Sequence, residues 1–215
     1  MLTFAEEFLL LAHDDKSGYF ADVAHGVMSA ALAGAALMDL ALLNRIDMDP
    51  QHLMLIDRTL TGEPILDFCL EAITLKAESM KADDWVEELS RHGDELREMA
   101  LNRLLQRGIL KREERRFLWV FNTRVYPTID NRETVEVKRR ISNILFSDEI
   151  PDPRDIFLIA LADGSDLLSR VFNPDEVDNR RERIQAIVRL DMLGQVVCDY
   201  VRDTLNAPLI PPPGI

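Results

Sequence analysis

The residues that could carry out acid–base or metal chemistry are scattered along this sequence. Four histidines are present, at His13, His25, His52 and His92. The acidic pairs Asp14-Asp15 and Asp83-Asp84 are adjacent in sequence, which is typical of turns and helix caps, whereas catalytic carboxylates have to face each other across a site. The sequence contains no G-x-S-x-G, no H-E-x-x-H and no glycine-rich phosphate loop. We therefore expect no enzyme, no metal site and no cofactor.

The two cysteines, Cys69 and Cys198, are far apart and lie in apolar segments with helical periodicity. They form no C-x-x-C pair or Cys/His spacing, so neither a metal ligand set nor a disulfide framework is indicated. The first residues, MLTFAEEF, lack the positive charge that begins a signal peptide. These observations predict a cytoplasmic protein.

Asp39 is the acidic residue with the most apolar surroundings, in the segment LMDLALL. A carboxylate buried there without a partner would be costly. Two interpretations remain open: Asp39 faces outward or pairs with an arginine such as Arg45, or it is a functional acid. The first, structural interpretation is favoured because buried carboxylates are usually paired.

The formal charge of the chain is −13 at pH 7. Its overall field repels nucleic acid and anionic lipid, so a contact with phosphate would need a local basic patch. We therefore do not expect this chain to bind nucleic acid or anionic lipid through its overall charge.

The apolar pattern predicts a mainly α protein built as one compact multi-helix domain with a few short β-hairpins. Residues 1–205 form this domain, and residues 206–215 form a proline-rich tail. Helices are expected after the capping pattern Thr3-x-x-Glu6, over His25–Asn44 and Ile65–Lys76, from Trp85, over about 94–108, from Asp130 to Pro151, and as three stretches after Asp155. The run Gly26–Arg45 approaches a membrane-spanning length, but it is rich in alanine and contains Asp39, so it is expected to be a buried core helix.

The segment RRFLWVFNTRVYP predicts a protruding hairpin in which 117–121 form a strand and Asn122–Arg124 form the turn. Alternation along such a strand would make both of its faces apolar, so the hairpin would need the domain, a partner or a bilayer to cover it. The residues expected to contact a membrane or a second subunit are Phe117, Leu118, Trp119, Val120 and Phe121. A hairpin after a helix also resembles a winged-helix DNA-binding unit, a distant alternative. The helix before it carries Asp94, Glu95 and Glu98, so no nucleic-acid partner is expected.

Five segments, taken in order, resemble the Golgi phosphoprotein 3 family. They are LTFAEEFLLLAHDDKSGY, LAGAALMDLALLNRI, TGEPILDFCLEAI, LLQRGILKREERRFLWVF and PDPRDIFLIALADGSDLL. The resemblance implies a mostly helical domain, and in the family this domain binds phosphatidylinositol 4-phosphate at the Golgi membrane. Because the chain begins at the domain without a long polar extension, it resembles a prokaryotic relative.

The family holds the lipid headgroup with one tryptophan and three arginines. Carried onto this chain, these positions are Ala24, Ala33, Asp94 and Arg97, of which only Arg97 keeps the family residue type. A phosphomonoester needs several converging donors, so the residues do not predict specific recognition of phosphatidylinositol 4-phosphate.

Two functions follow. The first is a non-enzymatic peripheral membrane or adaptor protein that binds a phosphoinositide, another anionic lipid or the tail of a membrane protein through Arg97 and the hairpin. The second is a self-associating interaction module in which the hairpin forms a homo-oligomer and no lipid is bound.

Overall fold

The computed structural model describes residues 1–48, 52–76, 80–117 and 121–207. Its helices are α1 (Phe4–Ala12), α2 (His25–Leu42), α3 (Pro64–Leu75), α4 (Ala82–Ser90), α5 (Gly93–Gln106), α6 (Arg132–Phe146), α7 (Pro153–Gly164), α8 (Leu168–Val171), α9 (Pro174–Asn179), α10 (Arg181–Val188) and α11 (Met192–Asn206). The strands of these described residues form two antiparallel pairs, β1 (Ile46–Met48) with β2 (Leu53–Leu55) and β3 (Glu113–Phe117) with β4 (Phe121–Val125). The expected mainly α class is confirmed.

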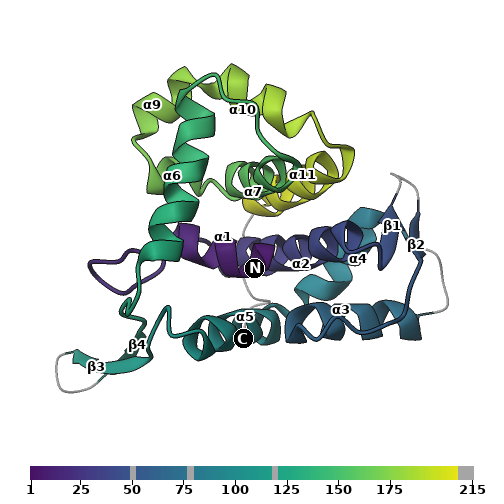
Figure 1. Ribbon diagram of the computed structural model, residues 1–215, viewed down its shortest axis with the longest axis horizontal. Coiled ribbons are helices and arrows are strands. Elements are labelled where there is room, and N and C mark those ends of the chain that lie inside the picture. Colours follow the sequence, from purple (N-terminus) through teal and green to yellow (C-terminus); the bar gives the residue numbers. More distant parts are fainter. Residues whose placement is uncertain (49–51, 77–79, 118–120, 208–215) are drawn as a thin grey trace, which may run out of the picture.

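Helices α1 and α2 form the middle of the molecule. In Figure 1, α3 and α5 lie on one side of them, and α6, α7, α10 and α11 lie on the other. Helix α1 begins with the expected capping box, in which Thr3 accepts from the Glu6 backbone and Glu6 accepts from the Thr3 backbone. Every residue of α1 is buried, so this short helix forms the centre of the core.

Helix α2 is long and apolar enough to cross a membrane, but 78% of the segment His25–Leu42 is buried inside the fold. Its small residues allow close contact with other helices: a Cβ built on Gly34 would lie 2.2 Å from Cγ1 of Val197 on α11. The predicted buried core helix is therefore confirmed, and glycine is needed where α11 crosses it.

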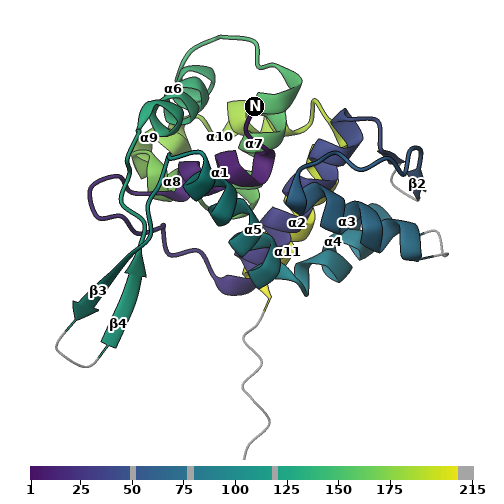
Figure 2. The same ribbon diagram turned by 60° about the horizontal axis from the view of Figure 1, so that its bottom comes forward.

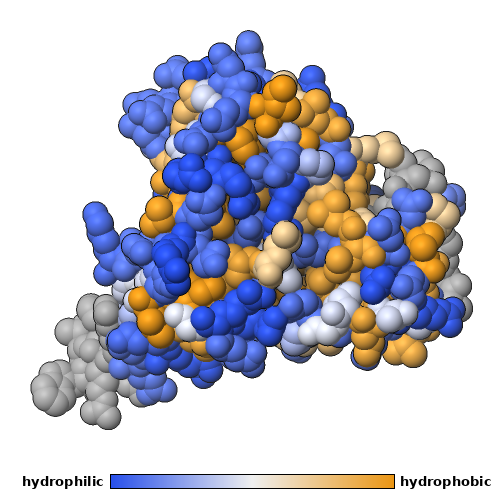
Figure 3. Space-filling model, viewed as in Figure 1, coloured by the Kyte–Doolittle hydropathy of each residue, from blue (hydrophilic) through white to orange (hydrophobic). Residues whose placement is uncertain are grey.

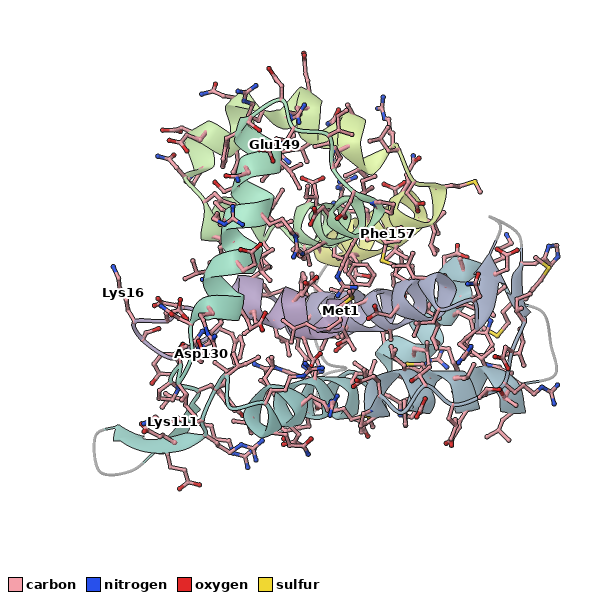
Figure 4. The ribbon with its side chains drawn as sticks, viewed as in Figure 1. Met1, Lys16, Lys111, Asp130, Glu149 and Phe157 are labelled. Atoms are coloured by element: carbon pink, nitrogen blue, oxygen red, sulfur yellow. The ribbon has the colours of Figure 1, made fainter. Side chains whose placement is uncertain are left out.

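Ion pairs join the middle layer to α6 and α7; Phe157 of α7, labelled in Figure 4, also packs against this layer, with its ring 5.6 Å from that of Phe4. Glu7 of α1 binds Arg140 of α6 at 3.2 Å and Arg154 of α7 at 3.0 Å. Asp39 is only 7% exposed, accepts a hydrogen bond from the Phe4 backbone at 2.7 Å and lies 3.5 Å from Arg154. Of the two structural options, the outward-facing position is wrong because Asp39 is buried, and the contact with an arginine is confirmed. The suggested partner is wrong, because Arg45 pairs with Asp57 instead.

Several predicted boundaries need correction. Helix α4 begins at Ala82, so Asp83 and Asp84 lie in its first turn and not before it. There their negative charges are stabilised by the positive end of the helix dipole. After α7, the chain forms α8, α9, α10 and α11 in place of the two expected stretches, because Asp191 caps a new helix at Met192.

The hairpin of β3 and β4 projects from the helices, as Figure 2 shows. The predicted position of the turn is wrong: Phe117 ends β3 and pairs with Phe121, which begins β4, so 122–124 lie inside a strand. The side chains of Phe117 and Phe121, and the whole of Leu118, Trp119 and Val120, lie outside what the structure describes. The predicted apolar faces of the hairpin therefore stay a prediction.

Both cysteines are free and buried. Burial raises the pKa of each thiol to about 12. Such thiols stay protonated at neutral pH, which is typical of packing residues and not of nucleophiles. No group of His, Cys, Asp and Glu within the described ranges is arranged to hold a metal ion.

Candidate functional site

A cavity of about 320 Å³ lies where α2 and α5 begin, closed by the segment before α2. Its lining comprises Ala21, Asp22, Val23, Ala24, His25, Met28, Ser29, Gly93, Asp94 and Arg97. The two helices meet closely here, since a Cβ built on Gly93 would lie 2.0 Å from Oγ of Ser29. A glycine at the start of α5 therefore brings this helix against α2 and sets the width of the cavity.

Arg97 is the cation of this cavity. Its guanidinium carbon lies 5.4 Å from the ring centroid of Phe20, a cation–π contact that orients the group without neutralising it. Its Nε atom is buried and has no hydrogen-bond partner, and Arg97 makes no ion pair with any residue that the structure describes. The site thus holds a positive group with hydrogen-bonding capacity to spare.

Two carboxylates face the same cavity. Asp94 is 80% exposed at its side chain, and its Oδ1 lies 3.8 Å from Nδ1 of the equally open His25, beyond hydrogen-bond distance. Asp22 is exposed and also lines the cavity. The cavity therefore presents two carboxylates, the guanidinium of Arg97 and the imidazole of His25.

A second cavity of about 430 Å³ continues from the first along the base of the hairpin and shares Arg97 and residues 21–23 with it. It reaches Tyr126, whose ring lies 5.6 Å from Phe20 and 5.8 Å from the guanidinium of Arg112. The basic groups at this end are paired, because Glu98 lies 2.9 Å from Arg112 and 4.0 Å from Arg124. The charge of Arg97 is therefore less compensated than that of the two neighbouring arginines.

The structure brings together three of the four positions carried over from the family. Ala24, Asp94 and Arg97 line the first cavity, whereas Ala33 is fully buried in α2 and lies outside it. Sequence reasoning missed Phe20, which positions Arg97, and Asp22, which adds a second carboxylate. No pattern around SGYFAD distinguishes these two residues from an ordinary loop.

A third, apolar groove of about 350 Å³ lies far from the hairpin and is lined by residues of α3 and of the preceding loop, among them Leu60, Leu70 and Leu75. Figure 3 shows that apolar side chains gather toward this end, while hydrophilic ones cover most of the surface near α6. None of the residues predicted from the sequence to form a site lies in this groove.

The fold and the site define a class of protein: a layered helical domain with an arginine-bearing cavity beside a projecting hairpin. The sequence model of the family described as Golgi phosphoprotein 3 (GPP34) matches residues 4–207. The chain therefore belongs to the Golgi phosphoprotein 3 family, as the ordered segments predicted. A comparison with curated proteins found no match.

Proposed function

We propose that this chain is a non-enzymatic peripheral membrane protein that holds the phosphate of a lipid headgroup with Arg97. The observation that carries the proposal is the environment of this arginine: it lines a cavity, its guanidinium lies over the ring of Phe20, and its buried Nε has no hydrogen-bond partner. A planar guanidinium suits phosphate because it can donate two parallel hydrogen bonds. Membership of the Golgi phosphoprotein 3 family supports the proposal that the ligand is a lipid.

The proposal does not include specific binding of phosphatidylinositol 4-phosphate. A phosphomonoester carries a charge between −1 and −2 near neutral pH. In this cavity it would meet Asp94 and Asp22 together with a single arginine. A phosphodiester, with one negative charge, fits one guanidinium better.

One arginine gives weak binding, so a second contact with the membrane is required. The hairpin is suited to supply it, because it projects from the domain next to the second cavity (Figure 2). Its end carries the sequence FLWVF, which a bilayer can accept without a protein partner. The protein would then lie on the cytoplasmic face of a membrane, where it could also meet the tails of membrane proteins.

The test is co-sedimentation of the purified protein with phospholipid vesicles. We expect Arg97→Gln and the double variant Trp119→Ser/Phe121→Ser each to reduce binding several-fold. Arg139→Gln removes an exposed helical arginine that pairs with Glu136 and lies outside all these cavities, so it should bind like the wild type. Equal binding by the wild type and Arg97→Gln would sink the proposal.

A self-associating module is the second candidate, favoured by the charge of −13 and by the projecting hairpin. Two copies could pair their hairpins across a twofold axis. Light scattering after size exclusion separates the two functions: this candidate requires a dimer or larger species that the Trp119→Ser/Phe121→Ser variant converts to a monomer. A wild-type monomer at all concentrations would contradict it.

A further inference from the structure

We infer that the headgroup carries a primary ammonium group beside its phosphate, as phosphoethanolamine does, with Arg97 binding the phosphate and Asp94 and Asp22 binding the ammonium. This inference rests on the proposed function, because it names the class of lipid that the same cavity takes. It is drawn from the charges that line the cavity.

The charges of the cavity match a zwitterion and not an anion. Asp22 and Asp94 outnumber Arg97 among the aspartate, glutamate, lysine and arginine side chains that line it. A headgroup with only negative charge would pair with Arg97 but would place its remaining oxygens near two carboxylates. A headgroup with one phosphate and one ammonium satisfies both kinds of group at once.

Both carboxylates are available to accept hydrogen bonds. Among the residues described, the ion-pair contact of Asp94 is with His25 at 3.8 Å, and its side chain is 80% exposed. Asp22 has no hydrogen bond or ion pair with any residue that the structure describes. Glu7 and Asp39, by contrast, are buried, and their carboxylates are held by hydrogen bonds and ion pairs within the fold.

The lining favours a primary over a quaternary ammonium. Choline has no N–H to donate, and proteins recognise it with aromatic cages. The described lining of the first cavity includes no Phe, Tyr or Trp side chain, and in the adjoining second cavity the ring of Phe20 is already in contact with the guanidinium of Arg97. An ethanolamine group has three N–H donors, and two carboxylates can accept them. The volume of about 320 Å³ lies at the small end of ligand cavities, which suits a compact headgroup.

The charge of the whole chain points the same way. A net charge of −13 gives a field that repels an anionic bilayer, whereas a zwitterionic bilayer has no net charge to oppose it. A single arginine would have to overcome that repulsion on an anionic surface. On a phosphatidylethanolamine surface it would not.

The test compares vesicles of phosphatidylcholine alone with vesicles that also contain phosphatidylethanolamine, phosphatidylglycerol or phosphatidylinositol 4-phosphate. We expect the wild type to bind the ethanolamine vesicles several-fold better than the others. Soluble phosphoethanolamine should compete, and phosphocholine or inorganic phosphate should not. This competition separates recognition of the headgroup from a general effect of ethanolamine lipids on bilayer packing.

The variants Asp94→Asn and Asp22→Asn should lose this preference several-fold while keeping binding that depends on Arg97. Asp148→Asn removes an exposed acidic residue in the loop after α6 and should keep the wild-type preference. Preference for phosphatidylglycerol, or an unchanged preference in the Asp94→Asn/Asp22→Asn double variant, would overturn the inference and leave the proposed function standing. Wild-type protein that binds no vesicle would overturn both.

Discussion

The guanidinium of Arg97 lies over the ring of Phe20, with 5.4 Å between its central carbon and the ring centroid. The ring attracts the cation through its π electrons but offers no acceptor in the plane of the guanidinium, so the N–H groups stay available. Phe20 is fixed in turn by the rings of His13 at 5.2 Å and Tyr126 at 5.6 Å. The charge that we assign to phosphate binding is therefore held in place by a loop and not by an acidic residue.

Replacing Phe20 by leucine should weaken vesicle binding by about 2- to 5-fold, the equivalent of roughly 0.5–1 kcal/mol for a cation–π contact. The apolar volume is largely kept, so the loss would come from the freed arginine. Phe146→Leu is the matched control, because Phe146 is also half-buried and makes a ring contact with Phe172 at 5.8 Å. Vesicle binding and thermal unfolding of both variants would check this. A loss of stability in Phe20→Leu without a loss of binding would contradict the role given to the ring.

Gly93→Ala should destabilise the protein by about 1–3 kcal/mol and weaken vesicle binding with it. The added Cβ would lie 2.0 Å from Oγ and 2.3 Å from Cβ of Ser29, so α5 would have to move away from α2. The same substitution made together with Ser29→Gly should cost less than the two single changes summed. Urea unfolding of the four proteins measures this coupling, and simple additivity would show that the contact does not set the spacing.

The sequence predicted those features that depend on neighbouring residues alone and that the tertiary structure preserves. The capping box at Thr3 and Glu6 is a local rule, and the structure confirms it. The predicted turn at 122–124 was wrong because FLWVF has the pattern of a single strand, whereas cross-strand pairing places Phe117 opposite Phe121 and 122–124 inside β4. Pairing depends on both strands at once, so no single run of residues reveals it.

The candidate site was only partly accessible from the sequence. Arg97 came from the family resemblance, and the structure places it with Ala24 and Asp94 in one cavity. The assignment of Ala33 to the site is wrong because Ala33 is buried in the core. Counting positions along a helix does not show which side of the helix faces the core. The role of Phe20 depends on a contact between residues 77 positions apart, which periodicity and spacing do not report.

Gly34→Ala should destabilise the protein by about 1–3 kcal/mol without changing vesicle binding by the folded protein. Its Cβ would lie 2.2 Å from Cγ1 of Val197, where α11 crosses α2. Val197→Ala removes that methyl group, so the Gly34→Ala/Val197→Ala protein should be more stable than the sum of the single effects predicts. The free energies of urea unfolding test this, and an uncoupled pair would show that α11 can shift at no cost.

The buried carboxylates around Arg154 and Arg140 should make stability depend on pH. Glu7, Asp39 and Asp155 share these two arginines, so the cluster has one more negative than positive group when fully ionised. Burial raises the pKa of all three, and that of Asp39 from 3.8 to about 7. The folded protein therefore holds a proton that the unfolded chain releases between these two values.

A carboxyl whose pKa is higher in the folded state loses stabilisation as the pH rises through that interval. Asp39→Asn keeps a group that can accept the Phe4 hydrogen bond and removes the titration. We expect Asp39→Asn to match the wild type near pH 4 and to gain on it up to about pH 7, by an amount on the order of 1–4 kcal/mol. Urea unfolding from pH 4 to pH 8 measures the difference, with Asp148→Asn as the exposed control. A difference that stays constant over this range would show that the Arg154 contact keeps Asp39 ionised throughout, and the raised pKa would be wrong.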